Sequence, residues 1–178
     1  HVRSRRQRQM CIRDRINTIF DTDPGIDDAF ALNFLNKSDI FDVKMVSSVA
    51  GNVGIDYTTR NLRGLVKAMD WNVPVYRGLS KPLLGKQILA DEFHGANGLL
   101  GYSFDESELA PLENKGAIEA MINVLEENEK TLIIAVGPLT NIASLLIVRP
   151  DLKEKIGEIS LMGCLLYTSP SPRDRQKS

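Results

Sequence analysis

Residues 21–29 read Asp-Thr-Asp-Pro-Gly-Ile-Asp-Asp-Ala (DTDPGIDDA), and they connect the first strand predicted from the sequence to the first helix. The apolar run before them, INTIFD (16–21), is typical of a buried parallel strand, and residues 26–35 are rich in helix-forming side chains. A strand, a Pro-Gly turn and a helix in this order predict the first unit of an α/β sheet. The carboxylates then lie at the strand's carboxyl end, the edge where open α/β sheets bind ligands.

The alternation of strand and helix continues along the chain. Further strands are predicted at 43–50, 73–76, 131–136 and 156–162, and further helices at 57–69, 117–125 and 139–148. We expect Gly137-Pro138 to open the last of these helices, with the proline in its first turn. Residues 79–113 are rich in Gly, Pro and polar side chains and predict one long loop. The fold class expected is α/β, an open and mostly parallel sheet with helices on both faces.

The two ends of the chain differ from the rest in charge. Residues 1–15 carry six arginines against one aspartate, and residues 164–178 are also basic, whereas residues 16–163 are acidic. Native basic ends would favour nucleic-acid binding. One short DNA duplex explains both ends instead, because TGTCTCTTATACACATCT translates as CLLYTS (164–169) and its reverse complement encodes MCIRD (10–14).

That duplex resembles the transposase adapter used to prepare sequencing libraries. We therefore interpret residues 1–15 and 164–178 as adapter-derived and residues 16–163 as the natural sequence. Cys11 and Cys164 both lie in the adapter-like ends, so they indicate nothing about disulfides or metal thiolates. We expect no nucleic-acid partner, and no membrane partner either, because no apolar run reaches the roughly 18 residues of a membrane helix.

The four carboxylates of residues 21–29 point to a divalent cation. The Pro24-Gly25 turn allows Asp23 and the Asp27-Asp28 pair to converge on one point. Carboxylates held this close repel one another, and hard oxygen ligands select Ca²⁺ or Mg²⁺ over zinc. The alternative is helix capping, in which aspartates bind the free N–H groups of a helix N-terminus, and this explains one or two of the four.

Four stretches resemble the inosine-uridine preferring nucleoside hydrolases (nucleoside N-ribohydrolases) in order and spacing: DTDPGIDDA (21–29), VAGNVGIDYTTRN (49–61), HGANG (94–98) and AVGPLTNIA (135–143). The first is similar to the calcium motif of that family. Taken singly, Gly51-Asn52 is typical of an ordinary turn and Gly137-Pro138 of a helix start, and His94 fits a loop surface and a site equally well. The resemblance covers residues 16–163 and corresponds to the N-terminal half of a family member.

The resemblance implies a calcium-dependent hydrolase that splits ribonucleosides into base and ribose. It implies that Ca²⁺ is held by Asp23, Asp28 and the main-chain carbonyl of Val136. Asp23 would also be the catalytic base that activates a water. Asp21 would hold the ligands in their geometry without binding the ion itself.

The resemblance also implies the substrate contacts and the rest of the site. Asp27, Asn52 and His94 would bind the ribonucleoside, while a further calcium ligand and the group that assists the leaving base would come from the C-terminal half. We therefore expect this chain by itself to be inactive. We expect the full-length protein to be a cytoplasmic homo-oligomer.

Two other functions fit parts of the sequence. Asp21-Thr22-Asp23 matches the Asp-x-Asp of haloacid-dehalogenase-like phosphatases, in which the first aspartate is a nucleophile and Mg²⁺ assists. The residues that follow do not match the usual turn of those enzymes. A nucleoside- or sugar-binding module with a structural cation is the non-enzymatic alternative.

Overall fold

A computed structural model describes residues 15–87 and 94–163. The adapter-like ends, with both cysteines, lie outside the described residues apart from Arg15. The elements follow in the order β1 (Ile16–Thr22), α2 (Ile26–Lys37), β2 (Phe41–Ser48), α3 (Ile55–Ala68), β3 (Val75–Arg77), the 3₁₀ turn η1 (Glu106–Glu108), α5 (Ala117–Glu127), β4 (Thr131–Ala135), α6 (Thr140–Val148), the 3₁₀ turn η2 (Pro150–Lys155) and β5 (Ile156–Leu161). The predicted alternation of strand and helix is confirmed.

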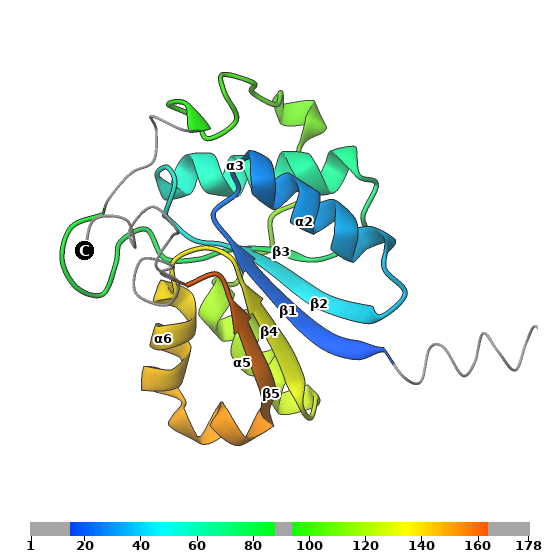
Figure 1. The fold of residues 1–178 in the computed structure, drawn as a ribbon, viewed down its shortest axis with the longest axis vertical. Coiled ribbons are helices and arrows are strands. Elements are labelled where there is room, and N and C mark those ends of the chain that lie inside the picture. The colour runs from blue at the N-terminus through cyan, green and yellow to red at the C-terminus, as the bar shows by residue number, and fades with distance from the viewer. Residues whose placement is uncertain (1–14, 88–93, 164–178) are drawn as a thin grey trace, which may run out of the picture.

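The five strands form one parallel sheet in the order β3-β2-β1-β4-β5. The first strand lies in the middle, with β2 on one side and β4 on the other (Figure 1). The chain therefore adds β2 and β3 on one side of β1 and then returns to add β4 and β5 on the other side. Such a reversal leaves a crevice beside the carboxyl ends of the central strands, where α/β proteins bind ligands.

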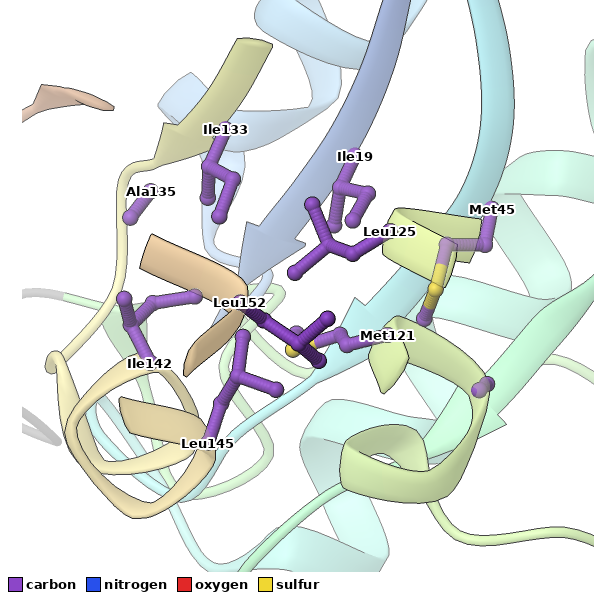
Figure 2. Packing of buried hydrophobic residues seen from close by; sticks show 10 residues of the cluster. Ile19, Met45, Met121, Leu125, Ile133, Ala135, Ile142, Leu145 and Leu152 are labelled. Carbon is purple, nitrogen blue, oxygen red and sulfur yellow. The ribbon is translucent and has the colours of Figure 1, made fainter. Parts of the chain in front are cut away.

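Helices cover both faces of the sheet, as predicted (Figure 1). Alternate residues of a strand point to opposite faces, so Phe20 joins the apolar cluster beneath α2 and α3, whereas Ile19 joins the cluster beneath α5 and α6. Figure 2 shows the second cluster, in which Met121 and Leu125 of α5 meet Leu145 of α6. Both clusters bury their side chains almost completely, which holds the central strands in place.

Two details differ from the sequence predictions. Pro138 lies before α6 and outside its first turn, because Leu139 is the residue that precedes the first helical residue, Thr140. The described part of the segment 79–113 is largely irregular as expected, but it contains η1, and an isolated bridge pairs Arg77 before the segment with Gly116 after it. In the described part of the chain, every helix is too short or too polar to cross a membrane.

Candidate active site

A cleft of about 460 Å³ opens at the carboxyl edge of the sheet. Five of the residues predicted for the site line it, namely Asp23, Asp27, Asn52, His94 and Val136. The remaining walls are Gly137, Pro138, Leu139, Met162 and Gly163. Residues that are widely separated in the sequence meet here because β1, β2 and β4 are neighbours and all end at the same edge.

Asp23 is buried at the floor of this cleft and is held by Asn52. The Asn52 main-chain N–H donates to Asp23 Oδ2 at 2.7 Å, and the Asn52 side-chain amide donates to the Asp23 carbonyl at 3.0 Å. Gly51 leaves the room for this contact, since a Cβ at that position would overlap the Asp23 carboxylate. The Gly51-Asn52 turn is therefore part of the site, and its two residues place the Asp23 carboxylate.

The Asp27-Asp28 pair diverges, contrary to the prediction that both would converge with Asp23. Asp27 is exposed toward the cleft, whereas Asp28 is buried. Asp28 accepts hydrogen bonds from the Thr22 hydroxyl at 2.6 Å and from the Gly25 N–H at 2.8 Å. The bond from Gly25 caps the N-terminus of α2, so the capping alternative applies to Asp28. Successive residues on a helix point about 100° apart, which separates the two carboxylates.

Asp21 lies beneath the cleft and is fully buried. Its Oδ1 accepts hydrogen bonds from the Ser47 hydroxyl and, at 2.8 Å, from the Asn141 side-chain amide. Its Oδ2 is buried without a partner among the described residues. Asp21 is not among the residues that line the cleft, and its supporting role stays a prediction.

The buried carboxyls of Asp21, Asp23 and Asp28 all have a raised pKa. Burial raises the pKa of Asp21 and of Asp23 to about 7, and it also raises the pKa of Asp28. The negative charge of Asp28 raises the pKa of Asp23 further. In the described part of the chain, every ion pair lies elsewhere, so neither Lys nor Arg compensates these charges.

This uncompensated charge fits a divalent cation. The donors at hand are carboxylate and carbonyl oxygens, which suit Ca²⁺ or Mg²⁺. Within residues 15–87 and 94–163, however, no three His, Cys, Asp or Glu side chains gather in a metal-binding arrangement. Two carboxylates and one carbonyl are fewer oxygens than the six to eight that calcium takes, so further ligands have to complete the set.

His94 reaches the cleft from the long segment that follows β3. It packs against the aspartate turn at Gly25, where an added Cβ would come within 2.7 Å of His94 Nδ1. That nitrogen is buried and has no hydrogen-bond partner among the described residues. His94 therefore lines the cleft, and its Nδ1 is buried without a hydrogen-bond partner among the described residues.

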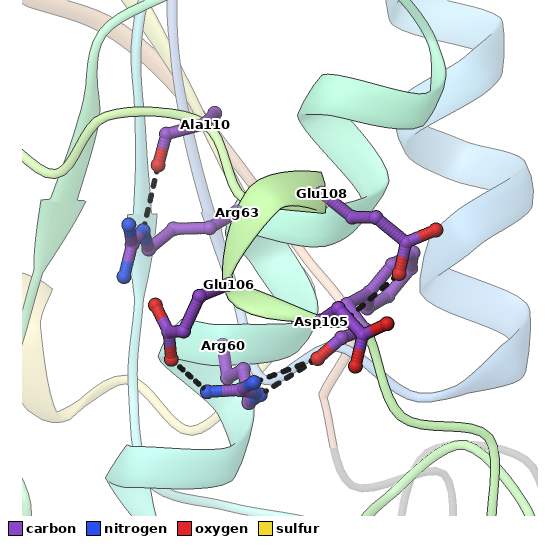
Figure 3. Close-up of polar contacts among 7 residues, drawn as sticks. Arg60, Arg63, Asp105, Glu106, Glu108 and Ala110 are labelled. Carbon is purple, nitrogen blue, oxygen red and sulfur yellow. Dashed lines mark hydrogen bonds and ion pairs between the residues drawn. The ribbon is translucent and has the colours of Figure 1, made fainter.

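Helix α3 anchors the segment that follows His94. The Asn61 side chain donates to the carbonyl oxygens of Pro24 at 3.3 Å and of Asn97 at 2.8 Å, so it ties the aspartate turn to the HGANG loop. Figure 3 shows the next contacts along the helix, where Arg60 pairs with Glu106 and Arg63 donates to the Ala110 carbonyl at 2.7 Å. The histidine is thus carried by a segment that the helix holds at several points.

Sequence reasoning missed Asn61 and Asn141 as parts of this framework. Both were within the quoted motifs, and both are buried in helices. Asparagine is a poor helix former, so its presence among apolar residues on the core side of a helix is a signal of a buried hydrogen bond. The contacts of Met162 and Gly163 with the cleft were also missed, because they depend on where β5 ends.

Comparison with known proteins agrees with this geometry. The family model described as inosine-uridine preferring nucleoside hydrolase matches residues 18–171. The chain belongs to this family. It is 36% identical over 149 residues to the non-specific ribonucleoside hydrolase RihC of Escherichia fergusonii, and 42% identical over 147 residues to the pyrimidine-specific ribonucleoside hydrolase RihA of Citrobacter koseri.

The likeness to relatives of this nucleoside hydrolase family extends to structure but covers part of their length. A purine-preferring ribonucleoside hydrolase from Gardnerella vaginalis superposes with a TM-score of 0.75 at 28% identity, over 83% of this chain and 48% of that one. The matches to RihC and RihA cover 84% and 82% of this chain, and 49% and 47% of the relatives. The chain thus spans about half the length of these relatives. Membership in the family also favours the hydrolase over the phosphatase alternative.

Proposed function

We propose that residues 16–163 carry the calcium- and ribose-binding part of a ribonucleoside hydrolase, which cleaves the N-glycosidic bond to release base and ribose. The observation that carries this proposal is the buried Asp23 carboxylate. It lies without a Lys or Arg partner among the described residues, at the floor of a cleft that also contains Asp27, Asn52 and His94. The relatives differ in specificity, so the proposal names a ribonucleoside and no particular base.

The ligands proposed for calcium are Asp23, Asp28 and the Val136 carbonyl. Val136 follows β4 and its N–H donates to the Asp21 carbonyl at 2.9 Å, which fixes the position of the peptide beside the end of β1. When bound, calcium would supply a positive charge that holds the ribose hydroxyls and acidifies a water. Asp28 keeps lone pairs beyond its two hydrogen bonds, so capping α2 is compatible with binding an ion.

The chain's own residues supply the remaining chemistry. Asp23 lies at the floor of the cleft, where its carboxylate would take a proton from the attacking water. Asp27 presents its carboxylate to the cleft, where it accepts hydrogen bonds from ribose hydroxyls. Glycoside cleavage passes through an oxocarbenium-like centre, and the negative charges beneath the cleft favour the positive charge that develops there.

Calcium binding is the first test, and it uses the 178-residue chain. Isothermal calorimetry with Ca²⁺ should show one site, and Asp23→Asn should weaken it at least 100-fold because a charged ligand is lost. Mg²⁺ should bind more weakly, since two aspartates and a carbonyl form an irregular cage instead of an octahedron. Tighter binding of Mg²⁺ than of Ca²⁺ would contradict the assignment of the metal.

Ribose release is the second test. The complete gene product that contains residues 16–163 should release ribose from inosine or uridine, lose that activity on chelation and regain it with calcium. The 178-residue chain should release none. Binding of ribose and calcium by the complete product without any release would support the sugar-binding module instead.

A further inference from the structure

Asn141 connects the ends of three strands to the turn that begins helix α6. Its side-chain amide donates to Asp21 Oδ1 at 2.8 Å, at the end of β1, and to the Ser48 carbonyl at 3.0 Å, at the end of β2. Its side-chain oxygen accepts the Leu79 N–H at 2.9 Å, from the segment that follows β3. The residue itself lies in α6, the helix that follows β4, so one side chain joins this helix to the ends of β1 and β2 and to the segment after β3.

The groups around Asn141 match its side chain both in the space they leave and in the hydrogen bonds they require. Asn141 is fully buried, and a Cβ at Gly78 would overlap both its amide and the Ser48 carbonyl. The position requires two donors and one acceptor on a short side chain, which asparagine provides and aspartate, serine or leucine does not. Loss of the side chain would remove a partner from a buried carboxylate and a buried carbonyl, and leaving buried polar groups with fewer hydrogen bonds is costly.

The bonds of Asn141 lead directly to the residues of the proposed site. Asp21 stands two residues before Asp23, and its carbonyl accepts the Val136 N–H at 2.9 Å. Ser48 leads into the Gly51-Asn52 turn, where the Asn52 main-chain N–H donates to the Asp23 carboxylate. Movement of Asn141 would therefore shift the proposed ligands relative to one another.

We propose that Asn141 is a positioning residue of this site, which sets the spacing between Asp23 and the Val136 carbonyl by fixing the strand ends on either side. The importance of that spacing for calcium rests on the proposed function. The positioning itself does not, because the three hydrogen bonds join groups of this chain to one another.

The first experiment measures amide hydrogen exchange in the metal-free 178-residue chain. Asn141→Ala should raise exchange at residues 48–53 and 136–138 at least 10-fold more than in the rest of the sheet. Asn141→Asp keeps the size and the acceptor for Leu79 but loses both donors, so it should give the same local pattern if the alanine variant fails to fold. Leu145→Ala is the matched control, since it removes a core side chain from the same helix and should raise exchange throughout the sheet.

The second experiment measures calcium affinity by calorimetry. Asn141→Ala should weaken calcium binding about 10- to 100-fold, as expected when a group that orients metal ligands is lost. Leu145→Ala, and Ser144→Ala with its buried and unpartnered hydroxyl on the same helix, should stay within twofold of the unsubstituted chain. This contrast separates positioning from a general loss of stability.

Two results would overturn the proposal. One is exchange in Asn141→Ala that rises no more at 48–53 and 136–138 than in Leu145→Ala. The other is calcium affinity in Asn141→Ala within twofold of the unsubstituted chain. If the unsubstituted chain binds no calcium, the calcium assignment in the proposed function is wrong. The exchange pattern alone then tests whether Asn141 positions the strand ends.

Discussion

Asn52 holds Asp23 by two hydrogen bonds, one from its main-chain N–H to the carboxylate at 2.7 Å and one from its side chain to the Asp23 carbonyl at 3.0 Å. These bonds join the ends of β1 and β2. They orient the carboxylate but supply no positive charge, so the cost of burying that charge remains. The Asp23 carboxylate is therefore held in a fixed orientation while its buried negative charge remains uncompensated. Both properties can be measured.

The metal-free chain should lose stability as the pH rises from about 4 to about 7. Burial raises the pKa of Asp21 and Asp23 from 3.8 to about 7, so the folded state binds more protons than the unfolded state in this range. The free energy of unfolding then falls with pH, by about 4 kcal/mol from Asp21 alone. Urea unfolding at a series of pH values measures this. With saturating calcium the part of the decline due to Asp23 should disappear, because its carboxylate is a proposed ligand. A metal-free stability that rises over the same range would refute the prediction.

Asp23→Asn should make the metal-free chain more stable at pH 8, by about 1–3 kcal/mol, because a neutral amide avoids the ionisation of a buried group. The same substitution should abolish calcium binding. Urea unfolding and calorimetry on one sample measure both effects. Asp27→Asn, at an exposed position, should change the free energy of unfolding by less than about 0.5 kcal/mol. A loss of stability in Asp23→Asn at pH 8 would show that the charge is already compensated.

Gly51→Ala should destabilise the chain by about 1–3 kcal/mol, because its Cβ overlaps the Asp23 carboxylate and comes within 2.6 Å of Pro138 Cδ. It should also weaken calcium binding by displacing the carboxylate. Gly54→Ala is the control three residues further on, where an added Cβ meets no atom within 4 Å. Equal effects of the two substitutions in thermal unfolding and calorimetry would argue against a steric role for Gly51.

Gly64→Ala tests how helix α3 anchors the segment behind His94. In an exposed helix this substitution would stabilise by about 1 kcal/mol. Here the added Cβ overlaps the ring of the buried Phe104, so we expect a loss of about 1–3 kcal/mol and faster amide exchange at 97–110. Stabilisation in urea unfolding would mean that Phe104 is not seated against the helix.

The exposed apolar end of α6 should promote self-association. Ile147 and Val148, its last two residues, are 69% and 62% exposed. Replacing Ile147 and Val148 together by lysine should lower the apparent mass in light scattering at high concentration. Asn33→Lys on the exposed side of α2 controls for added charge alone. An unchanged mass in the double variant would exclude this surface as the cause.

Local features of this chain could be predicted from its sequence because they depend on neighbouring residues. The apolar run at 16–21, the Pro24-Gly25 turn and the helix after it were correctly placed, and so was the carboxylate cluster at the end of the first strand. The α/β class follows from the same alternation. Physical preferences of this kind act over one or two turns of backbone, so a short window of sequence contains them.

The tertiary structure alone decided which of these groups meet. Asp27 and Asp28 are adjacent in the sequence, yet packing of α2 buries one and exposes the other. Asn141 and Asp21 are separated by 120 positions in the sequence. They touch because β4 pairs with β1 and not with β3, the strand that precedes it in the chain. That arrangement depends on the order of strands in the sheet, which is determined by how the two apolar clusters are buried and by no local preference of either residue.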